Sequence, residues 1–261
     1  RRLLMYNFFL RLRNEINYLR KKEWSLSEVG DFWDNLDNYD DINSTIYPYK
    51  ERFYNSKKLF FNSNLNNFNP NNCLDIQTRT GNGSIFWKKI FPKLNFTIAD
   101  FSKNFLKKSK INLIDKNIEH SDYFIKDFPL PFDNNFFDFI LTYETIEHIS
   151  NYKIFLSEIT RVTKKNGIII LTCPNYSWEA IHFVAAVLNI NHSEGPHSFI
   201  KKKELDNEIK KNNLKIINYN TSIFLPFNFR LSIFLDKLLN KFTPKLVKEK
   251  LFLRHSYILR K

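Results

Sequence analysis

From residue 72 onward, short apolar runs alternate with stretches in which apolar residues recur every three to four positions. The runs have the length of buried strands, and the stretches have the period of helices that pack on one side. Strands that alternate with helices form a largely parallel sheet covered by helices. The pattern predicts one α/β fold with strands at 73–76, 94–100, 123–126, 139–143, 168–173, 214–219 and 255–260.

Both ends of the chain combine helical periodicity with basic residues. Residues 1–23 place apolar side chains on one face and Arg or Lys on the other, and residues 224–251 do the same around a break at Pro244. Such segments either pack on the domain or lie on an anionic membrane surface, and the sequence leaves both open. We predict a helical N-terminal cap at 1–62, a core at 63–223 with an insertion at 174–205, and a basic amphipathic segment with the last strand at 224–261.

Composition supports a large core and a basic surface. The chain has 261 residues, 43% of them hydrophobic, and this composition does not indicate disorder. Forty basic residues against 27 acidic ones leave a net charge of +13. This charge favours an anionic partner such as lipid head groups, an acidic glycan or nucleic acid, or it marks only a solvated basic surface. Nucleic acid is the weaker hypothesis, because the basic residues are scattered or lie on amphipathic helices and no recognised nucleic-acid module is present.

The cysteines and the apolar runs indicate where in the cell we expect the protein to be located. Cys73 and Cys173 both fall in predicted strands, which indicates buried thiols in a reducing cytosol rather than a disulfide or a metal site. No run approaches the ~20 apolar residues of a membrane span. We therefore expect a cytoplasmic protein, or one that binds peripherally to the inner face of a membrane, and we predict no metal site.

A glycine turn follows the first strand. Gly81 and Gly83 lie between that strand and a helical pattern, so the backbone there lets a ligand approach closely and the helix start favours an anionic group. Phe86 stands where a dinucleotide fingerprint needs its third glycine, which disfavours NAD. Asp100 ends the next strand 25 residues after Asp75, where a nucleotide fold places an acid for ribose hydroxyls. These features predict a nucleotide-type cofactor.

The turn resembles the first motif of class I S-adenosylmethionine (SAM) dependent methyltransferases of the type 11 kind. In the motif D-x-G-x-G-x-G, Asp75 and Gly81 match the first and last positions, while Gln77 and Arg79 replace the two other glycines. Side chains at those two places would crowd the methionine end of the cofactor. The resemblance extends over residues 72–219 and implies a Rossmann-like seven-stranded mixed sheet, with an antiparallel last strand and helices on both faces.

The second matching stretch is more specific. Asp127, the tripeptide 130–132 (Leu-Pro-Phe) and the dipeptide 137–138 (Phe-Asp) follow the methyltransferase pattern in order and spacing. The resemblance implies that Asp127 pairs with the adenine amino group of SAM and that Asp100 binds its ribose. The residues that it places at the cofactor are Asp75, Gln77, Gly81, Gly83, Asp100, Phe101, Asp127, Phe128 and Tyr143.

A Glu-His pair follows the fourth strand, where the family often has one. His148 is our first candidate for the general base, since an unperturbed imidazole titrates near neutral pH, and Glu147 is a candidate to orient it. His197 is the second candidate base. All three also suit a purely structural role in the loops. Residues 25–53 look like the cap helices of many methyltransferases, in which an aromatic such as Trp33, Tyr39 or Tyr47 closes the pocket.

The insertion is similar to that of ubiquinone-biosynthesis O-methyltransferases. It contains an apolar helical stretch and then Gly-Pro-His at 195–197, Phe-Ile at 199–200 and Glu-Leu at 204–205. The resemblance implies an enzyme of EC 2.1.1 type that methylates a hydroxyl of a small-molecule, lipid-linked or glycan acceptor, such as a quinone or a sugar. The alternative is a methyltransferase-like binding or scaffolding subunit at a membrane surface, whose cofactor site Gln77 and Arg79 have closed. The sequence does not indicate the oligomeric state.

Overall fold

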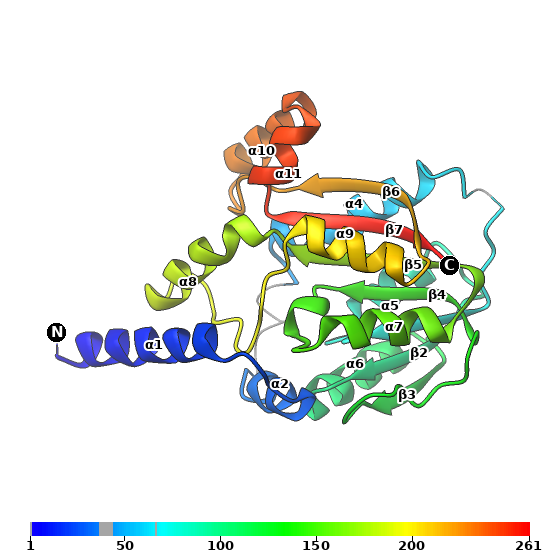
Figure 1. Ribbon diagram of the computed structural model, residues 1–261, viewed down its shortest axis with the longest axis horizontal. Helices are drawn as coiled ribbons and strands as arrows, with labels where there is room; N and C mark the ends of the chain where they lie inside the picture. Colours follow the sequence, from blue (N-terminus) through cyan, green and yellow to red (C-terminus); the bar gives the residue numbers. More distant parts are fainter. Residues whose placement is uncertain (1, 37–43, 66) are drawn as a thin grey trace.

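The computed structural model describes residues 2–36, 44–65 and 67–261, with side chains from residue 7 onward. Seven strands form one sheet in the order β3-β2-β1-β4-β5-β7-β6 (Figure 1). Strand β7 runs antiparallel to both β5 and β6, and the strands from β3 to β5 pair in parallel. The predicted seven-stranded mixed sheet is therefore confirmed. The strands are β1 (Asn72–Ile76), β2 (Asn95–Asp100), β3 (His120–Phe124), β4 (Phe137–Tyr143), β5 (Thr163–Pro174), β6 (Lys215–Ser222) and β7 (Arg254–Arg260).

Helices cover both faces of the sheet, and each face has its own apolar core. One core joins the sheet to α2, α7 and α9, and the other joins it to α4 and α5. The apolar face of α7, for example, is formed by Phe155, Leu156, Ile159 and Val162, all of which are buried. The helices are α1 (Arg2–Arg20), α2 (Leu26–Asp34), α4 (Tyr47–Phe61), α5 (Asn82–Lys88), α6 (Lys103–Asp115), α7 (Tyr152–Val162), α8 (Glu179–Val187), α9 (Lys202–Lys211), α10 (Arg230–Phe242) and α11 (Lys245–Leu251), with short 3-10 turns η1 (Ile146–His148) and η2 (Tyr176–Trp178).

Side chains cap the starts of several helices. Ser102 accepts a hydrogen bond from the backbone N–H of Phe105 and so caps the start of α6. Ser25 and Glu28 form a reciprocal capping box at the start of α2. Fixed helix starts matter here because α2 and α6 both begin near the carboxyl ends of the strands.

Several strand boundaries differ from the prediction. Strand β3 lies at His120–Phe124 rather than at 123–126, because it is an edge strand whose side chains are mostly exposed and no apolar run marks it. Strand β5 begins at Thr163, five residues before the predicted start, and β6 ends at Ser222, three residues after the predicted end. Asn166 lies within β5 and adopts a left-handed φ of 65°, where the pairing of β5 with β4 is irregular.

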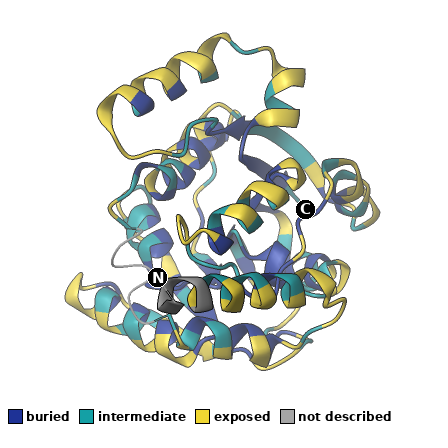
Figure 2. Cartoon of the chain, turned by 90° about the vertical axis from the view of Figure 1, so that its left-hand side faces the viewer, coloured by how far each residue is buried: buried dark blue, intermediate teal, exposed yellow. Residues whose placement is uncertain are grey.

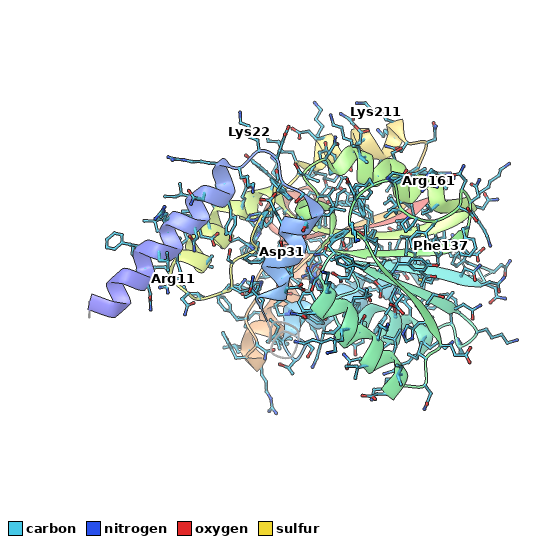
Figure 3. All side chains as sticks on the ribbon, turned by 90° about the horizontal axis from the view of Figure 1, so that it is seen from below. Arg11, Lys22, Asp31, Phe137, Arg161 and Lys211 are labelled. Atoms are coloured by element: carbon cyan, nitrogen blue, oxygen red, sulfur yellow. The ribbon has the colours of Figure 1, made fainter. Side chains whose placement is uncertain are left out.

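The two ends of the chain lie on different parts of the molecule. Helix α1 projects from the sheet beside α8, and Arg11 donates a hydrogen bond from Nε to the carbonyl of Val187 at 2.9 Å (Figures 1 and 3). Arg161 and Phe137 lie at the opposite end of the molecule (Figure 3). Helix α4 packs on β6 and β7, so this part of the N-terminal segment belongs to the domain. The division into 1–62, 63–223 and 224–261 stays a prediction.

Two further expectations concern the state of the cysteines and the presence of membrane-spanning helices. Cys73 and Cys173 are buried free thiols, and burial raises the pKa of both well above the usual value. Within the described ranges, no helix has both the length and the apolar character needed to cross a bilayer.

Candidate functional site

The glycine turn is closed by the carboxylate of Asp75. Oδ2 of Asp75 accepts hydrogen bonds from the backbone N–H of Ser84 at 3.0 Å, from its hydroxyl at 2.7 Å and from the Thr78 hydroxyl at 3.1 Å. A Cβ at Gly83 would lie 3.1 Å from the same oxygen, which explains the glycine. Burial raises the pKa of Asp75 to about 6 despite these hydrogen bonds. Asp75 therefore already accepts from one backbone N–H of the helix start, that of Ser84.

The loop after β1 has a left-handed backbone at every second residue. Gln77, Arg79 and Gly81 have φ values of 53°, 54° and 78°. A left-handed conformation costs a residue with a side chain roughly 1 kcal/mol. The loop thus keeps the backbone shape for which glycine is usual at 77 and 79, although both positions carry long side chains.

Those two side chains point into the site and are 3% exposed. Arg79 donates a hydrogen bond from Nη2 to the carbonyl of Glu144 at 3.1 Å, and its guanidinium carbon lies 5.3 Å from the centre of the Trp33 ring. The side-chain amide of Gln77 has no hydrogen-bond partner among the described residues. A buried amide in this state costs about 1–3 kcal/mol relative to a satisfied one, so it marks a place for a polar ligand group.

Asp100 lies against the same loop. Its Oδ2 accepts from the backbone N–H of Arg79 at 2.8 Å, and its Oδ1 accepts from that of Ser102 at 2.9 Å. Burial raises the pKa of Asp100 to about 7. The two acids predicted from the sequence, Asp75 and Asp100, therefore hold opposite sides of one loop at the carboxyl ends of β1 and β2.

Helix α2 covers this end of the sheet. A Cβ at Gly30 would lie 2.1 Å from the carbonyl oxygen of Phe101, so only glycine allows the helix to come this close. Asp34 accepts hydrogen bonds from the hydroxyl of Ser102 and, at 3.0 Å, from the backbone N–H of Asn104. Of the aromatics expected to close the pocket, Trp33 does lie at the site, while Tyr47 bonds Asp236 elsewhere and Tyr39 falls outside the described residues.

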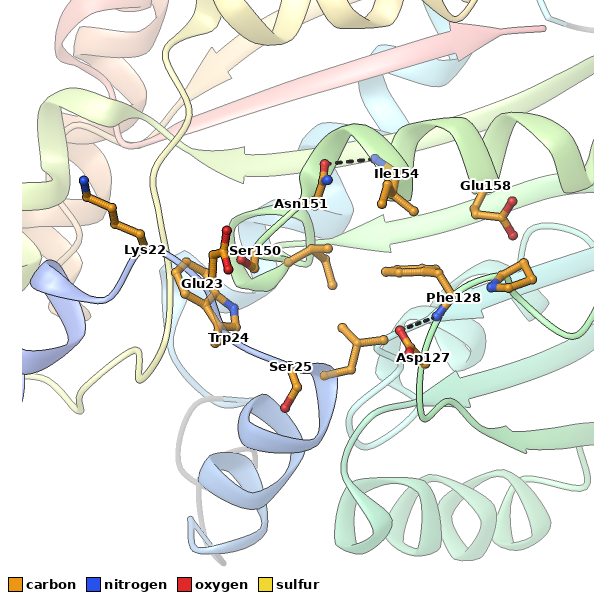
Figure 4. Close-up of a pocket in the computed structure, with 13 residues that line it drawn as sticks. Lys22, Glu23, Trp24, Ser25, Asp127, Phe128, Ser150, Asn151, Ile154 and Glu158 are labelled. Atoms are coloured by element: carbon orange, nitrogen blue, oxygen red, sulfur yellow. Dashed lines mark hydrogen bonds between the residues drawn. The ribbon is translucent and has the colours of Figure 1, made fainter.

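Six of the predicted cofactor residues line two cavities, and Gly81, Asp100 and Phe101 line neither of them. Asp75, Gln77, Gly83 and Tyr143 line one cavity of about 10 Å³. Asp127 and Phe128 line another, of about 680 Å³, between α7 and the segment that joins α1 to α2 (Figure 4). In Figure 4 the two sides of this larger cavity are formed by Trp24 and Phe128.

Asp127 is exposed, and its Oδ1 accepts a hydrogen bond from the backbone N–H of Phe128 at 2.8 Å. The loop that follows is tied to α7 by Arg161, which donates to the carbonyls of Leu130 at 2.9 Å and Phe132 at 2.7 Å. The sequence pattern over 127–138 thus encodes a rigid loop, which places Asp127 in the larger cavity and away from the small one.

His148 is fully buried beneath α2. Its Nδ1 lies 3.3 Å from the carbonyl of Pro196, a contact that assigns the proton to Nδ1 and leaves the lone pair on Nε2. Its ring meets the Trp33 ring edge to face at 5.3 Å between centres. Burial lowers the pKa of His148 to about 3, so the imidazole is neutral at pH 7.

The carboxylate that faces His148 belongs to Glu194 and not to Glu147. Oε2 of Glu194 lies 3.9 Å from Nε2 of His148, and Oε1 lies 3.3 Å from His182 and 3.6 Å from His192. Burial raises the pKa of Glu194, but these histidines more than offset that and hold it well below its usual range. Sequence analysis missed Glu194, although three histidines at 182, 192 and 197 signal a polar centre within an apolar insertion.

The other two candidates are buried nearby. Burial raises the pKa of Glu147 well above its usual value, and its backbone carbonyl accepts from the N–H of Ser198 at 2.8 Å. Within the described part of the chain, no hydrogen bond joins the Glu147 carboxylate to His148. The expected role of Glu147 in orienting His148 is therefore not supported by a contact. His197 has its Nδ1 2.8 Å from the carbonyl of Gly195. In the same ranges, no three His, Cys, Asp or Glu residues are placed to hold a metal ion.

A buried ion network lies below the loop. Glu144 pairs with Arg52 at 3.1 Å and with Arg254, and Arg79 reaches its backbone carbonyl. Burial raises the pKa of Glu144, but the charges of Arg254, Arg52 and Arg79 outweigh it and lower the pKa to about 2. Tyr143 lines the smaller cavity together with Arg52 and accepts a hydrogen bond from Nε1 of Trp87 at 2.8 Å.

Known proteins resemble this chain in sequence and in fold. The ubiquinone biosynthesis O-methyltransferase of Pelagibacter ubique is 30% identical over 132 residues, which are 48% of this chain and 50% of that protein. The mitochondrial ubiquinone biosynthesis O-methyltransferase of Dictyostelium discoideum is 25% identical over 142 residues, or 51% of this chain and 44% of that one. The structure of geranyl diphosphate C-methyltransferase from Streptomyces coelicolor covers 80% of this chain and 78% of its own, with a TM-score of 0.57 and 10% identity.

The family match decides the assignment. Residues 74–171, which contain the left-handed loop, Asp100 and Asp127, match the family described as "Methyltransferase domain". Residues 74–171 therefore form a methyltransferase domain. The chain spans about half the length of the curated relatives it matches. The cofactor of the family is SAM, and the structure from Streptomyces coelicolor contains its demethylated product, S-adenosylhomocysteine.

The residues of this domain suit SAM chemically. Asp100 offers a carboxylate for hydroxyls, and the buried amide of Gln77 offers a donor and an acceptor for the methionine end. The cavity beside Gln77 is too small for the whole cofactor, since cofactor sites measure about 300–1,000 Å³ and this cavity measures about 10 Å³. The side chain of Arg79 also lines this cavity.

Proposed function

We propose that the protein transfers the methyl group of SAM to a hydroxyl oxygen of a small or amphipathic acceptor. The observation that supports this most is the arrangement of Asp100, which lies against the left-handed loop after β1 within the segment that matches the methyltransferase family. The acid and the loop are both features of a nucleotide site at the carboxyl ends of adjacent strands. A decayed site has no reason to keep a buried, ionisable Asp100.

The chemistry requires alignment and removal of one proton. When bound, SAM supplies an electrophilic methyl group on a sulfonium. His148 accepts the hydroxyl proton at Nε2, since Nδ1 already carries a proton that faces the carbonyl of Pro196. The carboxylate of Glu194 then stabilises the imidazolium from 3.9 Å away. Trp33 over His148 excludes water from the reacting groups.

The insertion after β5 supports an acceptor with an apolar part. Ile181, Val184 and Leu188 of this segment are each about half exposed, with relative accessibilities of 51%, 51% and 52%. Such side chains suit the tail of a quinone or another lipid, and the two relatives are named for ubiquinone biosynthesis. A sugar hydroxyl of a glycan or its lipid-linked precursor is the second candidate acceptor. We place the reaction in the cytoplasm or at the inner face of a membrane.

Calorimetric titration with SAM and with S-adenosylhomocysteine tests the cofactor site. Asp100→Asn is expected to weaken the binding of both by about 10- to 100-fold, because a hydrogen bond to a charged acceptor contributes roughly 1.5–3 kcal/mol. Since the pKa of Asp100 is raised to about 7 by burial, its carboxylate is ionised above that pH and protonated below it. Wild-type affinity should therefore fall as the pH is lowered from 8 to 6, and the variant should lose this dependence.

The matched control is Asp122→Asn, which changes an exposed aspartate on β3 that pairs with Lys110 at 3.0 Å. It should bind both ligands as the wild type does. Circular dichroism establishes that each variant is folded. If folded wild-type protein binds neither ligand, the methyltransferase proposal fails and the scaffolding alternative takes its place.

A further inference from the structure

Helix α10 buries two polar residues and exposes most of its apolar ones. Ser232 and Asp236, one helical turn apart, are 1% and 0% exposed. The exposed apolar side chains recur at helical spacing, with relative accessibilities between 36% and 69%. They are Leu231, Phe234, Leu235, Leu238, Leu239 and Phe242. Most of α10, the upper helix in Figure 2, is exposed. This pattern is the reverse of a helix that packs on its own domain.

Asp236 fixes this orientation. Its Oδ2 accepts a hydrogen bond from the hydroxyl of Tyr47 at 2.7 Å, and its Oδ1 accepts from the backbone N–H groups of Phe224 at 2.6 Å and Leu225 at 2.8 Å. A buried carboxylate with three donors holds α10 in one rotational position. The outward apolar stripe is therefore built into the fold.

Helix α11 extends the same surface. Leu246, Val247 and Leu251 are 75%, 40% and 48% exposed. Lys248 donates from Nζ to the carbonyl of Asn240 at 3.0 Å, which ties α11 to α10. We call the exposed side chains of residues 227–251 the α10–α11 surface.

The charge of the α10–α11 surface selects its partner. Arg230, Lys237, Lys241, Lys245 and Lys250 are exposed. The acidic residues of this stretch are Asp236, which is buried, and Glu249, which is partly buried. A second copy of this surface would meet it with like charge, whereas an anionic bilayer offers opposite charge to the lysines and an apolar interior to the stripe.

We propose that the α10–α11 surface docks the protein on an anionic lipid bilayer, with the apolar stripe of α10 in the acyl boundary and the basic residues among the head groups. The surface connects to the acceptor side of the site. Asn175, directly after β5, donates from Nδ2 to the carbonyls of Glu249 at 3.0 Å and Phe252 at 2.9 Å. Docking would thus bring the insertion close to the bilayer that holds a lipid acceptor. This last link rests on the proposed function, but docking itself does not.

Co-sedimentation of the full chain with vesicles tests the proposal without cofactor or acceptor. Binding is expected to vesicles of phosphatidylglycerol and phosphatidylcholine and to be much weaker to phosphatidylcholine alone. The double variant Phe234→Ser/Leu238→Ser should lower the partition coefficient by about tenfold or more. The matched control is Ile111→Ser/Ile114→Ser on α6, whose side chains are 50% and 63% exposed near the opposite edge of the sheet (Figure 1). It should bind within about twofold of wild type.

A charge variant tests the contribution of the basic residues to vesicle binding separately from that of the apolar stripe. Lys237→Gln/Lys241→Gln should weaken binding to the anionic vesicles by about tenfold or more and reduce its dependence on salt. Equal binding of the Phe234→Ser/Leu238→Ser variant and the wild type would overturn the proposal. The proposal would also be overturned if the wild type bound no vesicles and light scattering showed that it forms dimers which this variant abolishes. SAM titration of the same variant should be unchanged, so failure here is distinct from failure of the methyltransferase proposal.

Discussion

Replacement of His148 by alanine is expected to slow methyl transfer by about a hundredfold to ten-thousandfold, the usual contribution of a positioned general base. Nε2 of His148 is the lone pair that the contact with Pro196 leaves available, and burial keeps the ring neutral. The assay follows labelled methyl from SAM into a total lipid extract and, separately, into a polysaccharide fraction. SAM affinity should stay within about threefold of wild type, because the imidazole acts on the acceptor and not on the cofactor.

Two controls give this expectation a sharp contrary outcome. His120→Ala, on edge strand β3, should leave the rate unchanged. Because the pKa of His148 is lowered to about 3, its protonation should cause no loss of rate between pH 7 and 5 when SAM is saturating. Glu194→Gln should slow transfer less than His148→Ala does and weaken no cofactor binding. A His148→Ala variant with full transfer activity would leave His197 as the next candidate base.

Loss of Glu144 should have the largest effect on stability. Glu144→Ala leaves Arg52 and Arg254, which are 2% and 4% exposed, without their shared carboxylate. Removal of one partner from a buried pair costs about 3–5 kcal/mol of unfolding free energy. Urea denaturation of wild type and variant at pH 7 measures the difference. Asp122→Asn, which breaks an exposed pair, should cost less than about 1 kcal/mol.

The same network makes a prediction for pH. The pKa of Glu144 is lowered to about 2 in the folded state, below its ordinary value of 4.5. Its stabilisation is therefore complete above the unfolded value and is lost as the pH falls from 4.5 towards 2. The stability difference between wild type and Glu144→Ala should narrow over this window. A constant difference down to pH 2 would mean that packing, and not charge, holds the network together.

The sequence predicted the parts of the site whose signals are local. Asp75, Gly81 and Asp100 follow strands that apolar runs mark clearly, and all three lie at the loop after β1 or beside it. Glu144 was missed as a network centre because its partners Arg52 and Arg254 lie 92 and 110 residues away along the chain. Only the folded sheet brings such groups together.

The same limit applies to the catalytic group and to the cap. Glu147 is adjacent to His148 in sequence, yet the short 3-10 turn directs its carboxylate elsewhere, and Glu194 approaches from the insertion. Adjacency along the chain therefore suggested the wrong partner. From the sequence, Trp33, Tyr39 and Tyr47 were equally good candidates to close the pocket. The close packing of Gly30 on Phe101 brings α2, which carries Trp33, to the site.

The left-handed loop at 77–81 bears on how relatives of this protein are found. Gln77 and Arg79 adopt left-handed backbone angles, which glycine adopts without steric cost. The turn therefore has this geometry without a glycine at either position. A search for those two glycines alone would miss this loop, while a comparison of backbone torsions would recover it. Proteins that lack the usual glycines of this motif are therefore better identified by the backbone torsion angles of the loop than by its residues.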